Sequence, residues 1–179
     1  MAADSNHHSA PRVEDDALLR GRGKFVDDVD KQGVAQAVFV RSPHAHARIL
    51  SISTQEAAKA KGVIGILTAA DMADIGNVSR HPPLTGRGGS KIALSHRPSL
   101  AQGKVMHVGE AVAMVVAESH AQALDAAELV AVEYEELPAV IDAREALKPD
   151  APQLFDGIPG NMALDWPGTV DDPAKVAVI

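Results

Sequence analysis

Apolar residues fall in short runs separated by glycine, proline and polar residues, which is typical of a chain with several strands and short helices. Strands are predicted at 34–41, 47–52, 63–67, 111–117 and 130–134, with a shorter one at 139–141. The run over 111–117, Ala-Val-Ala-Met-Val-Val-Ala, is continuous rather than alternating. A strand of this kind is expected to be covered on both faces.

Four capping boxes mark helix starts, since each has a capping residue followed three positions later by an acid or amide. The pairs are Ser53 with Glu56, Thr68 with Asp71, Ser119 with Gln122 and Asp142 with Glu145. Helices are predicted at about 54–61 and 120–130, and shorter ones after Thr68 and Asp142. The alanine content of 120–130 suits close packing on a sheet.

Two stretches interrupt this pattern. Residues 76–103 are rich in Gly and Pro and hold Arg80, Arg87, Lys91 and Arg97; so long a gap indicates a functional or mobile loop. Residues 148–173 carry five prolines and read as an extended linker that leaves the domain. The final residues, 176–179, resemble the beginning of a strand, and residues 1–12 are small and polar, as expected of a flexible tail.

Composition narrows the possible functions. A net charge of −7 and 3% aromatic residues argue against nucleic-acid binding. The absence of Cys excludes disulfides, Cys-ligated iron–sulfur clusters and thiol nucleophiles. No apolar run reaches the ~20 residues of a membrane span, and the first residues lack the apolar core of a secretory signal. A cytoplasmic location is therefore expected.

Two clusters near the start of the chain suggest ligand binding. His44 and His46 stand two apart where a strand begins, so both imidazoles are expected on one face, but no third metal ligand is spaced nearby. A polar strand edge with Arg48 is the favoured interpretation. Residues 20–24 (Arg-Gly-Arg-Gly-Lys) offer a nest for phosphate, but they lack the Gly-Lys-Ser/Thr of a P-loop, so an exposed basic turn is favoured.

Two further patterns are candidates for nucleotide binding and for catalysis. Residues 86–90 (Gly-Arg-Gly-Gly-Ser) lack the spacing of a dinucleotide fingerprint and favour a loop that orders against a partner. His107 and Glu110 stand at the mouth of the most apolar strand and form the one pair that suits acid–base catalysis. A structural role at the turn around Gly109 is the favoured interpretation. Other acidic pairs, such as Asp27-Asp28 and Asp171-Asp172, are expected on solvated faces.

Five stretches in register, 21–28, 40–52, 62–71, 107–119 and 123–142, followed by Pro159-Gly160-Asn161, resemble the amino-terminal hammerhead domain of the molybdenum hydroxylases. That family includes xanthine dehydrogenase, aldehyde oxidase and the large subunit of carbon monoxide dehydrogenase. The resemblance covers residues 12–165. It implies an α+β fold (α/β hammerhead), a mixed sheet with short alanine-rich helices packed on it. Residues 13–147 would form this domain, and 148–179 a linker toward a missing molybdenum-cofactor domain.

The resemblance also implies a role. The parent oxidoreductase would hydroxylate a substrate carbon with oxygen from water and pass electrons through a molybdenum–pterin cofactor, iron–sulfur clusters and FAD. These groups and the catalytic glutamate belong to other domains or subunits. We therefore assign no catalytic, cofactor-binding or metal residue to this chain. Its expected partners are those cofactor domains and the iron–sulfur and flavin subunits. The alternative is a stand-alone binding or assembly module that reuses the fold.

Overall fold

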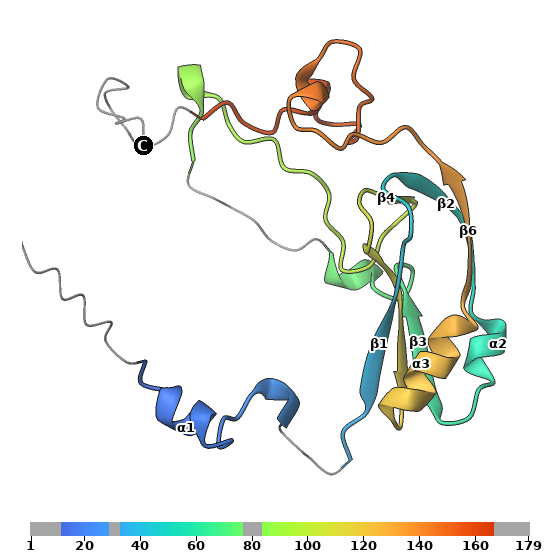
Figure 1. Ribbon diagram of the computed structural model, residues 1–179. Helices are drawn as coiled ribbons and strands as arrows, with labels where there is room; N and C mark the ends of the chain where they lie inside the picture. Colours follow the sequence, from blue (N-terminus) through green and yellow to red (C-terminus); the bar gives the residue numbers. More distant parts are fainter. Residues whose placement is uncertain (1–11, 29–32, 77–83, 167–179) are drawn as a thin grey trace, which may run out of the picture. The chain divides into compact units, whose positions relative to one another are not determined.

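The computed structural model describes residues 12–28, 33–76 and 84–166, and the chain divides into two units, Met1–Val34 and Ala35–Ile179. In the first unit a short helix, α1 (Asp15–Leu19), is followed by one turn of 3₁₀ helix at Val26–Asp28. All strands lie in the second unit (Figure 1). No helix in the described stretches is long and apolar enough to cross a membrane.

Six strands form two three-stranded sheets, in the orders β1-β5-β3 and β4-β2-β6. Every strand pair is antiparallel, so the strands form two antiparallel sheets in place of the single mixed sheet expected. Their bounds are β1 Gln36–Arg41, β2 Ala47–Ser53, β3 Val63–Thr68, β4 Lys104–Val105, β5 Ala111–Ala117 and β6 Ala131–Glu136. With the short helices described below, this arrangement confirms the α+β hammerhead class.

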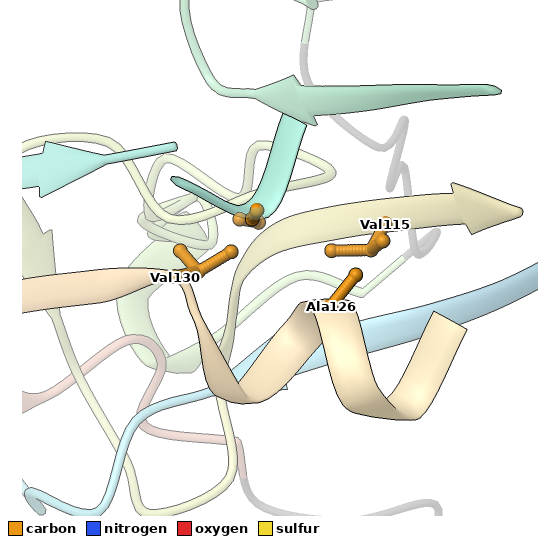
Figure 2. Packing of buried hydrophobic residues seen from close by; sticks show 5 residues of the cluster. Val115, Ala126 and Val130 are labelled. Carbon is orange, nitrogen blue, oxygen red and sulfur yellow. The ribbon is translucent and has the colours of Figure 1, made fainter. Parts of the chain in front are cut away.

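The main core lies between the first sheet and two helices, α2 (Gln55–Ala58) and α3 (His120–Glu128). Val115 at the centre of β5 faces Ala126 of α3, and Val130 closes the end of the cluster (Figure 2). Alanines at the contact let the helices approach the sheet closely. A second cluster, Ala47, Ala101, Val105 and Val112, joins the second sheet to the other side of β5.

The Ser119 capping box is confirmed, since the Ser119 hydroxyl accepts the backbone N–H of Gln122 at 3.3 Å and α3 begins at the next residue. The Ser53 box is wrong. Ser53 is the last residue of β2 and pairs with Ala131, so the sheet holds it extended and α2 is capped by Thr54 without a side-chain bond.

The other two boxes form only in part. Short 3₁₀ turns follow them, at Ala73–Ile75 and Glu145–Leu147, and neither turn has a side-chain cap. Asp71 accepts both the backbone N–H and the hydroxyl of Thr68, and these bonds lower the pKa of its carboxyl below 3.8. The first turn stops at Gly76, whose φ is 69°. The second stops because Pro149 keeps the residue before it extended.

The strand predictions hold to within two residues at each end for five of the six segments. The strand predicted at 139–141 is wrong, because Pro138 removes a donor and the chain leaves the sheet there. Five short elements were missed: α1, the two-residue β4, and the 3₁₀ turns at Val26–Asp28, Arg87–Gly89 and Pro159–Asn161. Elements this short carry no readable periodicity.

Gly62 ends the α2 segment with φ 81°, and a Cβ at this position would overlap the side-chain amide of Gln122. We expect Gly62→Ala to lower the free energy of unfolding by about 1–2 kcal/mol for the left-handed backbone, and by about 1 kcal/mol more because Gln122 moves out of the Ser119 cap. Gly103→Ala is the matched control, since its φ is 72° and the space is open. Equal losses in urea titrations of the two variants would contradict the role of Gln122.

Candidate functional site

Two adjoining hollows, of about 580 and 520 Å³, open beside the loop that enters β5. They share five lining residues, and we call them together the Glu110 groove. The shared residues are His96, Pro98, Met106, Glu110 and Phe155. The larger hollow is lined on one side by residues 94–106 and on the other by residues 154–158.

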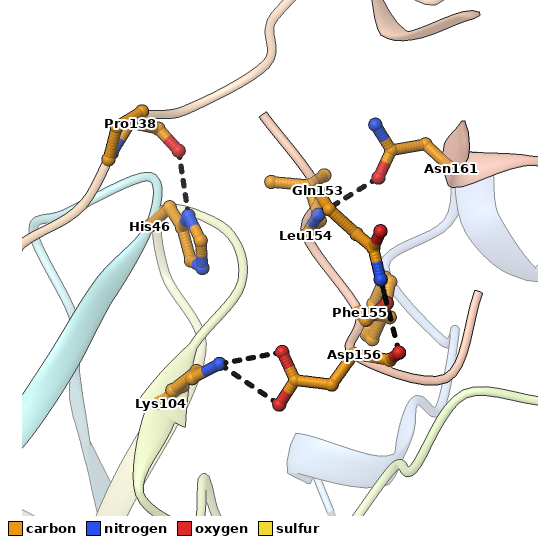
Figure 3. Close-up of polar contacts among 8 residues, drawn as sticks. All are labelled: His46, Lys104, Pro138, Gln153, Leu154, Phe155, Asp156 and Asn161. Atoms are coloured by element: carbon orange, nitrogen blue, oxygen red, sulfur yellow. Dashed lines mark hydrogen bonds and ion pairs between the residues drawn. The ribbon is translucent and has the colours of Figure 1, made fainter. Parts of the chain in front are cut away.

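The far wall of the groove is held in place by Asn161 (Figure 3). Its side-chain oxygen accepts the N–H of Leu154 at 2.9 Å, and its amide nitrogen donates to the carbonyls of Ala146 and Pro152. The backbone of Asn161 is left-handed, with φ 56°, and Gly160 before it has φ 65°. The Pro159-Gly160-Asn161 motif of the sequence is therefore a staple that closes the loop over 146–161.

One ion pair spans the groove. Lys104 of β4 donates to both carboxylate oxygens of Asp156, at 3.1 and 3.2 Å (Figure 3). Asp156 is 88% exposed, so water screens this pair and its net contribution is small. Next to Lys104 in the sheet, Arg48 of β2 pairs with Glu135 at 3.3 Å.

The structure places His107 and Glu110 close together, but their contacts stabilise a turn and do not form an acid–base pair. Glu110 is mostly buried and accepts the backbone N–H of Met106, while the nearest His107 nitrogen lies 3.6 Å away, too far for a hydrogen bond. Gly109 donates to the carbonyl of Ser42, and Ser42 donates to that of Glu110. These contacts fix the turn that leads into β5 and support the structural interpretation.

His44 and His46 do not converge. The Nδ1 of His44 lies 3.1 Å from Glu136, and the Nδ1 of His46 lies 2.7 Å from the carbonyl of Pro138 (Figure 3). A carbonyl only accepts, so the Nδ1 of His46 carries the proton of this bond. The Nε2 of His46 is buried and has no partner among the described residues. His46 thus fixes the point where the chain leaves β6.

The single tyrosine, Tyr134, lies against His44, with ring centroids 4.8 Å apart. Burial raises the pKa of its phenol above 10.0, and a hydrogen bond with Ser42 opposes the shift. The raised pKa favours the neutral phenol in the folded state, so its contribution to stability is complete below pH 10.0 and is lost as pH rises through the folded pKa.

We therefore expect the ultraviolet titration of phenolate to have a higher midpoint in the folded chain than in the denatured chain. The signal is unambiguous because the chain has one Tyr. Tyr134→Phe, which should show no titration, is the control. A folded midpoint at or below the denatured one would contradict the burial of this phenol.

In both glycine-rich candidate sites, arginine side chains bind carboxylates of the chain itself. In the first unit Arg20 and Arg22 both bind the carboxylate of Asp16, at 2.6 and 3.1 Å, which favours the basic-turn interpretation over a phosphate nest. In the second unit Arg87 pairs with Asp165 at 3.2 Å, and its backbone N–H donates to the Asp165 carbonyl. Of the loop over 76–103, residues 77–83 lie outside the described residues, and its mobility stays a prediction.

The residues that the structure describes do not fit a molybdenum site. Within the ranges that the structure describes, no group of three or more His, Cys, Asp or Glu side chains is placed to hold a metal ion. The chain has no Cys. We assign no reaction step to a metal or pterin cofactor on these residues.

Residues 20–138 match the family described as the a/b hammerhead domain of aldehyde oxidase and xanthine dehydrogenase. The carbon monoxide dehydrogenase large chain of Afipia carboxidovorans is 43% identical over 84% of this chain and 18% of its own length. The xanthine dehydrogenase molybdenum-binding subunit of Escherichia coli O157:H7 is 36% identical over 84% of this chain and 20% of its own length.

A solved structure gives the same relationship. Quinoline 2-oxidoreductase from Pseudomonas putida 86 superposes with a TM-score of 0.75 at 39% identity, over 86% of this chain and 19% of that one. The chain thus spans about one fifth of the length of these relatives. With a family match over most of its length, the chain belongs to the aldehyde oxidase and xanthine dehydrogenase hammerhead family.

Proposed function

We propose that this chain is the amino-terminal structural and assembly domain of the molybdopterin-binding large subunit of a molybdenum hydroxylase, and that it is catalytically inactive alone. One observation carries the proposal: relatives that match over 84% of this chain are about five times longer, and one of them is named a molybdenum-binding subunit. In this proposal residues 13–147 form the domain, 1–12 a tail, and 148–179 lead toward the cofactor domains.

The geometry of the Glu110 groove supports inactivity of the isolated domain. The carboxylate best placed for proton transfer, Glu110, is bound to the N–H of Met106, and His107 does not contact it by a hydrogen bond. Lys104 and Arg48 are paired with Asp156 and Glu135. A general base must be within hydrogen-bond reach of the substrate proton that it removes, and the carboxylate of Glu110 is held in a turn by the N–H of Met106.

The parent enzyme would hydroxylate a substrate with electrons leaving through molybdenum, iron–sulfur clusters and FAD in other domains or subunits. This domain would pack against those parts, in the cytoplasm. Its Ala-rich helices pack closely on the sheet, and Asn161 holds the loop over 146–161 in place. Both features suit a rigid domain on which other domains pack. A rigid element loses little conformational entropy when partners dock on it.

The test is the size and metal content of the natural polypeptide that contains this chain. We expect an antibody to the domain to detect a band several-fold larger than 18.7 kDa, and the purified band to carry molybdenum with iron–sulfur and flavin partners. The isolated chain should have no oxidoreductase activity and no bound molybdenum. A band near 18.7 kDa without such partners would instead establish a stand-alone module.

A further inference from the structure

The two faces of the sheet β1-β5-β3 differ in what covers them. Helices α2 and α3 pack on the face that carries Val115 (Figure 2). On the opposite face, Phe39, Met114 and Leu67 form a row across the three strands, since Phe39 and Leu67 both pair with Met114. Directly paired residues of antiparallel strands point to the same side.

A second row lies beside the first, because Ala37 and Gly65 both pair with Val116. We call these two rows, Phe39-Met114-Leu67 and Ala37-Val116-Gly65, the Phe39 face. None of the six residues is charged or polar. Phe39 is 42% exposed, and Met114, Val116 and Leu67 are only half-buried. Neither hydrophobic cluster of the described residues includes any of the six.

The sequence of β5 is not typical of a strand that has one solvent-exposed face. An antiparallel strand with one solvated face alternates apolar and polar residues, whereas a strand covered on both sides is apolar throughout. Met114 and Val116 stand at the positions where polar side chains would be expected. A contiguous apolar patch across three strands, unlike a single exposed apolar residue, marks an interaction surface.

The length of the relatives indicates what covers this face. They match this chain over only 18–20% of their own length, so about four fifths of such a polypeptide lies outside the structure. A continuous polypeptide holds its own later segments at high effective concentration near this face. A surface made only of apolar residues is typical of permanent contacts, which are more hydrophobic than transient ones.

We propose that the Phe39 face is the surface on which an apolar helix or strand of the later part of the same large-subunit polypeptide packs. The inference rests on the proposed function and names the contact through which the domain would act. Arg41 borders the face, with its guanidinium 5.4 Å from the centre of the Phe39 ring and bonded to the Gly109 carbonyl. A charged group therefore lies against the Phe39 ring at one edge of the apolar face.

The test uses the full natural polypeptide in its assembled enzyme, with a photoreactive aromatic amino acid in place of Phe39. We expect its cross-links to reach a segment of the same polypeptide beyond this chain. The same replacement at Leu124, an α3 residue that is 45% exposed, is the control and should give at least tenfold fewer such cross-links. Cross-links to a second copy, to another subunit or within these 179 residues, or none at all, would overturn the proposal.

A second pair of variants tests the chemistry of the contact. Phe39→Glu is expected to lower the yield of assembled, molybdenum-loaded enzyme about tenfold, because burial of a charge against an apolar surface is unfavourable. Leu124→Glu should lower the yield less than twofold. Equal yields from the two variants would overturn the proposal, and Phe39→Trp, which keeps an apolar ring, should restore assembly.

The two proposals fail in different ways. If the natural polypeptide is short or carries no molybdenum, the proposed function fails, and the inference fails with it. If the polypeptide is long and loaded with molybdenum but Phe39 cross-links elsewhere, the inference alone fails.

Discussion

Val115→Ala is expected to lower the free energy of unfolding of this chain by about 2–3 kcal/mol. The side chain of Val115 is fully buried between the sheet and the helices, facing Ala126 (Figure 2). Its loss removes about 1.6 kcal/mol of apolar transfer free energy, and a cavity beside rigid alanines adds to this because the backbone cannot collapse into it. Urea unfolding followed by far-ultraviolet circular dichroism measures the change.

Two controls make this measurement specific. Val108→Ala removes the same atoms from a side chain that is 63% exposed, so its effect should stay within about 0.5 kcal/mol. Ala126→Val, added to Val115→Ala, restores the lost volume from the helix side and should recover part of the stability. A loss below that of the Val108 control would contradict the central place of Val115 in the core.

Asn161→Ala is expected to open the loop over 146–161 and dismantle the far wall of the Glu110 groove. The three hydrogen bonds of the Asn161 side chain join Leu154, Ala146 and Pro152. At about 1 kcal/mol net for each bond, their loss costs about 3 kcal/mol locally. Alanine also tolerates the φ of 56° poorly, at about 1 kcal/mol more.

The measurement is amide hydrogen exchange of residues 146–161, which should become at least tenfold faster while the amides of β5 stay unchanged. Asn161→Gly separates the two causes, since glycine accepts the left-handed backbone but makes no side-chain bonds. Asn161→Asp keeps the acceptor for Leu154 and loses both donors, so it should fall between wild type and alanine in protection. Unchanged exchange in all three variants would show that the loop is held by other contacts.

Local signals in the sequence predicted much of the fold. The apolar run of β5 was placed at its observed bounds, and Ser119 was correctly identified as the cap of α3. Both depend on interactions within a few residues, which is why pattern alone finds them. The Ser53 box failed for the opposite reason: the pairing of Ser53 with Ala131 is made across 78 positions of chain, and it overrides the local capping preference.

The groove was not predicted at all. Its walls come from residues 94–106 and 154–158, which lie about fifty positions apart in the sequence and are brought together only by the tertiary fold. The Pro159-Gly160-Asn161 motif contributes to the family resemblance, yet its role depends on three backbone partners that the sequence does not mark. The pair Gly160-Asn161, two residue types that favour a left-handed backbone, is the local signal that could have indicated a tight turn there.

By itself, the sequence determined five of the six strands, the start of α3, the family and the expectation that β5 is covered on both faces, because these follow from residue periodicity, capping and motifs in register. Only the tertiary structure decided the roles of the polar residues. It separated His44 from His46, committed Glu110 to the N–H of Met106 and left the Phe39 face outside both hydrophobic clusters of the described residues. The physical reason is that a side chain's chemistry depends on its partners, and those partners are brought to it by contacts between distant parts of the chain.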